Sequence, residues 1–304
     1  SVAVAADADP LIERTTKLSD WAKKNQKTVQ IVGALVAAAL LSVAGFFYMD
    51  QKRETQASEL LAKAVADERA RIGEPPKDDE PSDGAPVFKT YDARRESALA
   101  KYREVQSKYP RTGAAILARL AEGSLLLDMR KPDEAAQAFS DVKASPLAAA
   151  DMEVKGRAIE GLGFAHEQKA QANAAEADKH YEEALKAYRE LENTVEVKGF
   201  KELAMYHQAR VLEDKGDKEK AKEVLLSLKE RLNKPDDATI SGAPAGPTFP
   251  YLREVAMDRL RALDPSAAPK QSGSPGGGAQ LTPAQIRKMI EEAQKKGAAG
   301  GDPH

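Results

Sequence analysis

The sequence predicts an all-α protein in which one N-terminal transmembrane helix is followed by helical hairpins stacked as an α-solenoid. Three observations predict this class. The 304-residue chain is 31% charged and only 5% aromatic, which is typical of exposed helices rather than sheets. Residues 29–49 form an uninterrupted apolar run. After that run, small, aromatic and apolar residues recur together at helical spacing.

The overall charge and the lack of cysteine exclude several classes of function. Lys and Arg number 46 and Asp and Glu 48, so the formal net charge is −2. A chain this close to neutral has no general attraction for polyanions, and we expect no nucleic-acid partner. The absence of Cys excludes disulfides, thiolate-bound zinc and a thiol nucleophile, but it fits an oxidising or a reducing compartment equally well.

The apolar run 29–49 has the length of a membrane span. It contains no ionisable residue, and as a helix it measures about 30 Å, the thickness of a bilayer's hydrocarbon core. Trp21 precedes it and Phe46, Phe47 and Tyr48 close it, as expected at the two headgroup regions. A cleaved signal peptide is the alternative, but the long charged leader and the large aromatic residues argue against it. We therefore predict a retained anchor.

Two further features of the run bear on its packing and orientation. Small residues stand four positions apart, the spacing that lets two membrane helices approach closely; they are Gly33, Ala37, Ala38 and Ser42. Basic residues are slightly more frequent before the run (Arg14, Lys17, Lys23, Lys24, Lys27) than after it (Lys52, Arg53, Lys63, Arg69). By the positive-inside rule this small excess favours a cytoplasmic N-terminus.

The rest of the chain divides at changes of composition. A polar helix is expected to continue over 52–71, and the Pro-rich acidic stretch 74–86 is expected to be a loop. The predicted domains are a leader (1–28), the transmembrane helix (29–49), a juxtamembrane helix with the acidic loop (50–86), a repeat domain (87–265), and a linker with a short C-terminal helix (266–304).

One pattern recurs four times in the repeat domain: Ala, a ring or Leu four positions later, and an apolar residue three positions after that. Its members are Ala98, Tyr102 and Val105; Ala135, Phe139 and Val142; Ala184, Tyr188 and Leu191; and Ala221, Leu225 and Leu228. Twelve positions before two of these alanines stand Gly123 and Ala209, each followed by a leucine, Leu126 or Leu212. This spacing predicts a close contact between the two helices of a hairpin.

The hairpins resemble the tetratricopeptide repeat, a helix-turn-helix unit of 34 residues. Two copies depart from the pattern. Gly163 lies 21 positions before Ala184, which predicts an insertion and lengthened helices. The first copy lacks a first helix, whose place residues 52–71 can take. An irregular helical bundle is the alternative, because Ala is abundant and the motif is degenerate.

The last two segments are read as separate units. Residues 249–265 predict an amphipathic helix that closes the final repeat, with Leu252, Val255, Ala256, Leu260 and Leu263 on its apolar face. Residues 267–278 predict a flexible linker, and 281–296 a short helix with Thr282 as N-cap and Pro283 at its first position. That helix is either a partner-binding motif or a frayed tail.

No group of residues points to catalysis. His166, His180 and His207 have no metal-pair spacing, and each is expected to be a solvated or satisfied surface residue. No Ser stands in a nucleophile motif, and the glycines at 276–278 follow no strand. We therefore expect no catalytic, cofactor-binding or metal site, no small-molecule substrate, and a protein that is not an enzyme.

A hairpin array offers instead a concave surface for a peptide or a helix. By analogy with tetratricopeptide proteins, the groove-lining residues are Leu117, Leu120, Ser124 and Leu127; Arg157, Glu160 and Phe164; and Leu203, Tyr206, Arg210 and Glu213. The paired Lys and Asn that clamp a C-terminal carboxylate in some of those proteins are absent. A mixed apolar and charged groove is expected.

The chain has a leader, then an anchor, then degenerate hairpins, and just before the span it has an aromatic residue, an Asn and a Lys, namely Trp21, Asn25 and Lys27. This order and these residues resemble the YfgM-like family, whose members are ancillary subunits of the Sec translocon. The likeness covers about residues 15–235. It implies a single-pass protein of the bacterial inner membrane with periplasmic repeats. The partners it implies are translocon subunits, a periplasmic chaperone or secreted clients. The alternative is a structural subunit or coordinator of another envelope assembly, in cell division or cell-wall synthesis.

Overall fold

The fold of the described chain is all-α, as its composition predicts. The computed structural model describes residues 24–74, 84–233 and 249–267. Two short strands, β1 (Arg71–Ile72) and β2 (Val87–Phe88), pair in parallel between the first two helices. The helices are α2 (Gln26–Glu68), α3 (Tyr91–Lys108), α4 (Gly113–Asp128), α5 (Pro132–Lys143), α6 (Pro146–Ala150), α7 (Met152–Ala172), α8 (Ala177–Thr194), α9 (Phe200–Asp214), α10 (Lys218–Leu232) and α11 (Pro250–Leu263).

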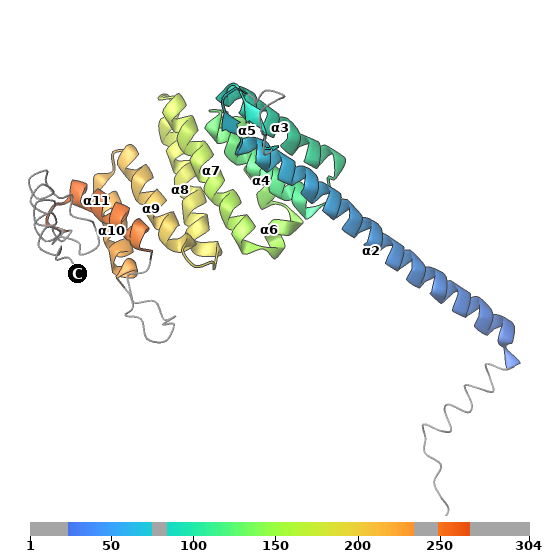
Figure 1. The fold of residues 1–304 in the computed structure, drawn as a ribbon. Helices are drawn as coiled ribbons and strands as arrows, with labels where there is room; N and C mark the ends of the chain where they lie inside the picture. Colours follow the sequence, from blue (N-terminus) through green and yellow to red (C-terminus); the bar gives the residue numbers. More distant parts are fainter. Residues whose placement is uncertain (1–23, 75–83, 234–248, 268–304) are drawn as a thin grey trace, which may run out of the picture.

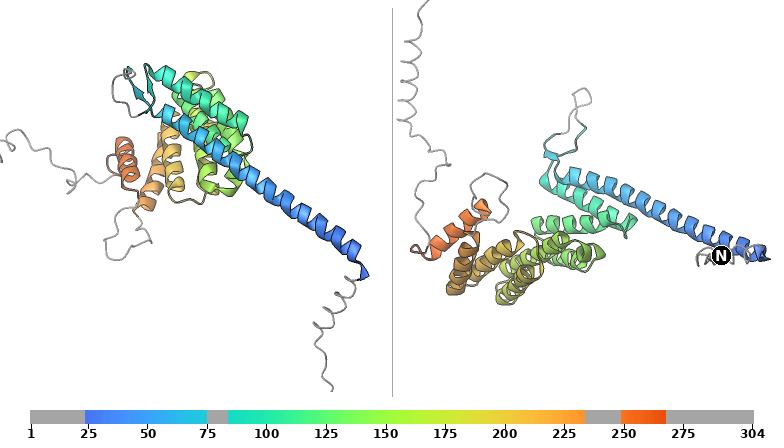
Figure 2. Two further views of the ribbon diagram at one scale, coloured as in Figure 1. Left: turned by 45° about the vertical axis from the view of Figure 1, so that its right-hand side comes forward. Right: turned by 90° about the horizontal axis from the view of Figure 1, so that it is seen from below.

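Helix α2 is one continuous helix of 43 residues. Its N-terminal half extends away from the other helices, whereas its C-terminal half packs on α3 and α4 (Figures 1 and 2). The large apolar side chains of the extended half are at least half exposed; those described are Ile31, Leu35, Leu40, Leu41, Val43, Phe46, Phe47, Tyr48 and Met49. No proline interrupts α2, so the apolar run and the polar stretch after it form one element.

The separate transmembrane helix predicted at 29–49 is not recovered. Among the residues that the structure describes, none of the helices has both the length and the apolar character required to cross a bilayer. Of the small residues predicted to pack against another membrane helix, Gly33 and Ala37 lie on α2, and Ala38 and Ser42 are exposed. The Ser42 hydroxyl donates a hydrogen bond to the Ala38 carbonyl at 2.8 Å, within its own helix.

The C-terminal half of α2 supplies the first helix of the first hairpin. Ala57 and Ala64 are fully buried against α3, in one apolar cluster with Tyr102. The helix ends at Glu68, and Arg71 belongs to β1 rather than to the helix predicted over 52–71. The acidic loop falls partly outside the described residues, and β1 and β2 bring its two ends together, with Gly73 N–H donating to Phe88 O at 2.9 Å.

Helices α3 to α11 follow one another in chain order across the molecule, each packed on its neighbours in sequence (Figures 1 and 2). All twelve residues of the recurring pattern are buried, as predicted, and so are Gly123, Leu126, Ala209 and Leu212. Side-chain N-caps begin α3, α4 and α7, at Thr90, Thr112 and Asp151 respectively. The core is therefore a row of local clusters between successive helices rather than one central cluster.

Aromatic rings pack directly on glycines of the neighbouring helices. A Cβ built on Gly123 would lie 2.8 Å from the Phe139 ring, and one built on Gly161 only 2.4 Å from the same ring. A Cβ on Gly163 would lie 2.3 Å from Tyr188. The predicted small-residue contact at Gly123 is confirmed. The irregular spacing at Gly163 reflects long helices, since α7 has 21 residues and α8 has 18.

Helix α11 closes the row by packing on α10, as predicted for 249–265. Ala256 and Leu260 are fully buried, while Leu252 and Leu263 are partly buried in the same cluster. The linker and the helix predicted at 281–296 lie outside the described residues, as do residues 1–23 of the leader.

Candidate protein-binding groove

The eleven residues predicted to line a groove lie on three helices that are each the first of a hairpin. Leu117, Leu120, Ser124 and Leu127 lie on α4, Arg157, Glu160 and Phe164 on α7, and Leu203, Tyr206, Arg210 and Glu213 on α9. The structure joins the α7 and α9 sets through direct contacts. The four α4 residues do not share one environment. Leu117 and Ser124 are exposed, whereas Leu120 and Leu127 pack partly into the core.

Glu160 is buried, with 8% of its surface exposed, so it is a structural link rather than a groove-lining side chain. Its Oε1 lies 3.2 Å from His207 Nε2 on α9, and its Oε2 accepts a hydrogen bond from Arg157 Nη1 at 3.1 Å. Burial raises the pKa of this carboxyl, but the hydrogen bonds and electrostatic interactions with His207 and Arg157 outweigh it and hold the pKa below its ordinary value. Glu160 therefore carries its charge inside the α7–α9 contact.

His207 is buried, so the surface position predicted for it is wrong. It is 5% exposed and packs among three aromatic rings. Its ring centroid is 4.9 Å from Tyr188, 5.0 Å from Phe164 and 5.9 Å from Tyr206. Helical spacing could have indicated this burial, because His207 lies three positions after Ala204 and four before Val211, and both are buried.

A second ionic contact lies beside the first. Arg210 Nη2 donates to Glu167 Oε1 at 2.5 Å, and the guanidinium lies 5.4 Å from the centre of the Phe164 ring. The Tyr188 hydroxyl donates to the same Glu167 oxygen. Burial, together with the charge of Glu167, raises the pKa of Tyr188 well above its ordinary value. Glu167 and Tyr188 were not predicted as members of this face, because each belongs to a buried contact between helices.

Helix α11 extends the face beyond the predicted set. Arg259 Nη1 donates to Glu213 Oε2 at 3.0 Å, and its guanidinium lies 5.6 Å from the centre of the Tyr206 ring. Arginine stacked on an aromatic ring is a frequent feature of protein-binding surfaces. Tyr206, Arg210 and Glu213 thus act with partners on α7 and α11.

An apolar groove of about 550 Å³ opens where α7, α9 and α11 meet. It is lined by Glu153, Arg157, Val197, Lys198, Gly199, Phe200, Leu203, Phe249, Pro250, Tyr251 and Leu252. Of these residues, only Arg157 and Leu203 were predicted to line a groove. The Arg157 guanidinium lies 5.0 Å from the centre of the Phe200 ring, so the charged rim rests on an apolar floor.

Backbone conformation shapes one wall of this groove. Gly199 is the N-cap residue just before α9 and has a φ of 94°, and Phe249 is the N-cap residue just before α11 and has a φ of 52°. Both values are left-handed; this is easy for glycine and costly for phenylalanine. A Cβ on Gly199 would lie 3.1 Å from the Phe249 ring, so the two turns fit closely together.

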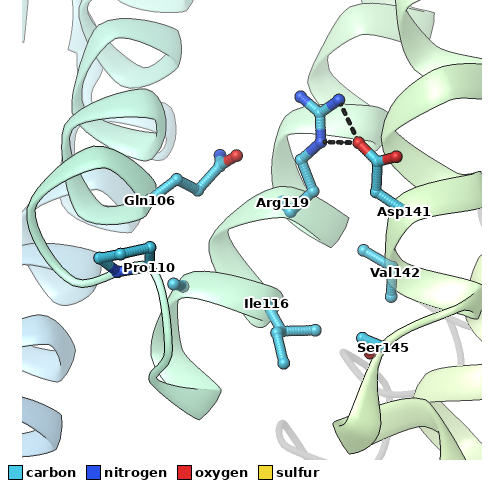
Figure 3. A pocket seen from close by; sticks show the side chains of 8 residues that line it. Gln106, Pro110, Ile116, Arg119, Asp141, Val142 and Ser145 are labelled. Carbon is cyan, nitrogen blue, oxygen red and sulfur yellow. Dashed lines mark hydrogen bonds and ion pairs between the residues drawn. The ribbon is translucent and has the colours of Figure 1, made fainter.

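A smaller cleft of about 280 Å³ lies between α3, α4 and α5 (Figure 3). Arg119 spans it, donating from Nε and Nη2 to Asp141 Oδ2 at 3.1 and 2.7 Å. The same guanidinium donates from Nη1 to Glu122 at 2.8 Å. The charge of Arg119 is already paired with two carboxylates. This cleft therefore offers fewer unpaired charged groups to a ligand than the larger groove does.

Within residues 24–74, 84–233 and 249–267, no cluster of three or more His, Asp or Glu could hold a metal ion. His166 and His180 stack with ring centroids 6.1 Å apart, and burial lowers the pKa of His166.

No family model, curated protein or solved structure matches the chain.

Proposed function

We propose that this protein is a membrane-anchored scaffold whose helical hairpins bind other proteins and carry out no catalysis. The observation that carries the proposal is the apolar groove between α7, α9 and α11. Its apolar lining includes the rings of Phe200 and Phe249 and, at the edge, Tyr251, and its rim carries Glu153 and Arg157. An apolar floor with a few polar groups at its edge is the usual character of a site that binds a helix or an extended peptide.

The proposed anchor is residues 29–49. It is supported by the uninterrupted apolar sequence and by the large exposed apolar side chains on the extended half of α2. In water such a surface is unfavourable, since each square ångström of apolar area costs about 25 cal/mol when left exposed. We place the N-terminus in the cytoplasm and the hairpins in the periplasm.

The anchoring proposal is tested by extracting membranes that contain the full chain with alkaline carbonate. The chain is expected to stay in the membrane pellet. Protease added to spheroplasts is expected to cleave residues 87–265. Complete release by carbonate contradicts the anchor, and survival of 87–265 in intact spheroplasts contradicts the orientation.

For the partner, we propose translocon subunits, a periplasmic chaperone or secreted clients, as the resemblance to the YfgM-like family implies. We further propose that the hairpins are of the tetratricopeptide type. This is supported by the buried Ala and ring positions and by the rings packed on Gly123 and Gly163.

The partner is tested by photo-crosslinking in native membranes from a benzoyl-phenylalanine placed at Leu203, inside the groove. Capture of translocon subunits is expected, and the charge reversal Arg157→Glu is expected to weaken it. The matched control places the same crosslinker at Lys186, an exposed position on α8. Exclusive capture of division or wall-synthesis proteins would favour the alternative and contradict the translocon proposal.

A further inference from the structure

We infer that residues 281–296 of this chain bind in the apolar groove between α7, α9 and α11 as an amphipathic helix supplied by the same molecule. The segment reads LTPAQIRKMIEEAQKK and lies outside the described residues. Ile286, Met289, Ile290 and Ala293 follow the i, i+3, i+4, i+7 spacing, which places them in one stripe of a helix. This is the pattern of anchors in helix-in-groove recognition.

The groove has apolar surface that the described chain leaves uncovered. Tyr251 at its edge is 78% exposed, although it is a large aromatic residue beside the partly buried Leu252. Burying a side chain such as Ile286 or Ile290 against rings of this kind removes apolar area from water on both sides. The groove and the stripe are therefore complementary in chemistry.

The reach of the chain favours the C-terminal segment as the occupant. Ala267 follows α11, and Phe249 at the groove begins the same helix, so the two are about 25 Å apart along the helix axis. The linker 268–280 has 13 residues rich in Gly, Pro and Ser. By composition, a Gly- and Ser-rich segment of that length is expected to have a root-mean-square span of about 20 Å and a limit of about 43 Å. When span and distance match in this way, the local concentration is of millimolar order.

The N-terminal leader does not have this advantage. The chain enters the described part at Lys24, at the far tip of α2, which lies at the opposite end of the molecule from α11 (Figure 1). The segment beginning at residue 268, by contrast, starts about one length of α11 from the groove, within the reach of its linker. A weak helix–groove contact would then suffice for occupancy within one molecule.

The charges beside the stripe can be satisfied at the groove's rim. Glu153 and Arg157 stand at that rim, with side chains 64% and 50% exposed. In a helix, Arg287 and Glu292 flank the apolar stripe on its two sides. Each of these charges has an opposite charge available on α7.

The inference rests on the proposed function only in taking the groove as a helix-binding site. It is tested on the full chain, purified in detergent, with benzoyl-phenylalanine at Tyr251 and the crosslinked peptides identified by mass spectrometry. We expect a crosslink to 281–296 within the same chain. The double substitution Ile286→Glu with Ile290→Glu is expected to reduce its yield about tenfold or more, because it removes apolar burial.

Two controls accompany the experiment. Lys288→Glu with Lys295→Glu adds two glutamates on the opposite side of the predicted helix, and it is expected to leave the crosslink in place. A crosslinker at Tyr91, which is 59% exposed on α3, is expected not to reach the segment. Within the described helices, the variants replace only the exposed rings of Tyr251 or Tyr91, and all the other substitutions lie in 281–296.

Three results overturn the inference. They are the absence of a crosslink to 281–296, a crosslink that survives the stripe substitutions, and crosslinks between isotopically labelled and unlabelled chains in a mixture, which would place the segment on a second copy. Loss of translocon capture with the intrachain crosslink intact contradicts the proposed partner but not this inference, so the two failures are distinguishable.

Discussion

The carboxylate of Glu54, on α2, accepts a hydrogen bond from the backbone N–H of Gly113, 59 positions away, at 2.8 Å. Its other oxygen accepts the next backbone N–H, that of Ala114, also at 2.8 Å. These N–H groups belong to the first turn of α4 and have no acceptor within their own helix. One side chain of the long helix thus caps the first helix of the next hairpin and complements its dipole.

The first prediction concerns this cap. Glu54→Ala is expected to lower the free energy of unfolding by about 1–2 kcal/mol, because two helix-terminal donors lose a charged acceptor. Amide exchange should accelerate at Gly113 and Ala114. Denaturant unfolding followed by circular dichroism gives the first quantity and hydrogen exchange the second. Glu59→Ala, at an exposed position on the same helix, is the control, and an equal effect there would argue against the cap.

The second prediction concerns the glycines under aromatic rings. Gly161→Ala is expected to destabilise the protein by about 1–3 kcal/mol, because the new methyl overlaps the buried Phe139 ring. The overlap outweighs the gain of about 1 kcal/mol that alanine brings to a helix interior. Thermal and denaturant unfolding measure the difference.

The control for this prediction is Gly45→Ala, also within a helix. A Cβ at position 45 meets nothing within 4 Å. That variant is expected to be as stable as the parent or slightly more stable. If Gly161→Ala behaved in the same way, the close approach of ring and backbone would be wrong.

The third prediction concerns pH. Glu122 is fully buried and accepts hydrogen bonds from Arg103 at 2.7 Å, Gln106 at 2.8 Å and Arg119 at 2.8 Å. Burial raises the pKa of Glu122, but the hydrogen bonds and the charge of Arg119 prevail and lower it below the ordinary value. A lowered pKa in the folded state stabilises the fold above the ordinary value, and this stability is lost as pH falls toward the folded value.

Glu122→Gln should therefore lower stability near neutral pH and flatten the loss of stability between roughly pH 5 and pH 3. Denaturant midpoints measured across that range provide the test. The exposed Glu96→Gln is the control and is expected to leave the pH profile unchanged. A profile as steep in Glu122→Gln as in the parent would refute the assigned role.

The fourth prediction concerns the attachment of α11. Arg259→Ala removes the ion pair to Glu213 and the stacking on Tyr206, so hydrogen exchange over residues 250–263 is expected to accelerate several-fold, equivalent to about 1 kcal/mol. Arg261→Ala is the control, because the pairing of Arg261 within the described residues is with Asp258 of its own helix, at 2.6 Å. Equal acceleration in both variants would contradict the contact.

Local patterns predicted the helices and their buried faces well. The Ala, ring and apolar positions, such as Ala98, Tyr102 and Val105, are buried because helical periodicity alone decides which side chains share a face. The same reasoning placed the apolar face of α11. It did not separate a buried position from a groove-lining one, so Glu160 was predicted as lining although it is buried.

The groove itself could be predicted only in part. Arg157 and Leu203 were found because they recur on first helices, whereas Phe249 and Tyr251 were assigned only to a closing helix. Their place in the groove depends on two left-handed turns, at Gly199 and Phe249, whose combined geometry no single segment determines.

The sequence by itself determined that the described chain is helical and which positions of the recurring pattern are buried, because these properties depend on residues within a few positions of one another. Only the tertiary structure decided that Glu54 caps α4, that Glu160 meets His207, and that α7, α9 and α11 enclose a groove. Such contacts join residues that are tens of positions apart. They depend on how successive helices pack, which short-range spacing does not specify.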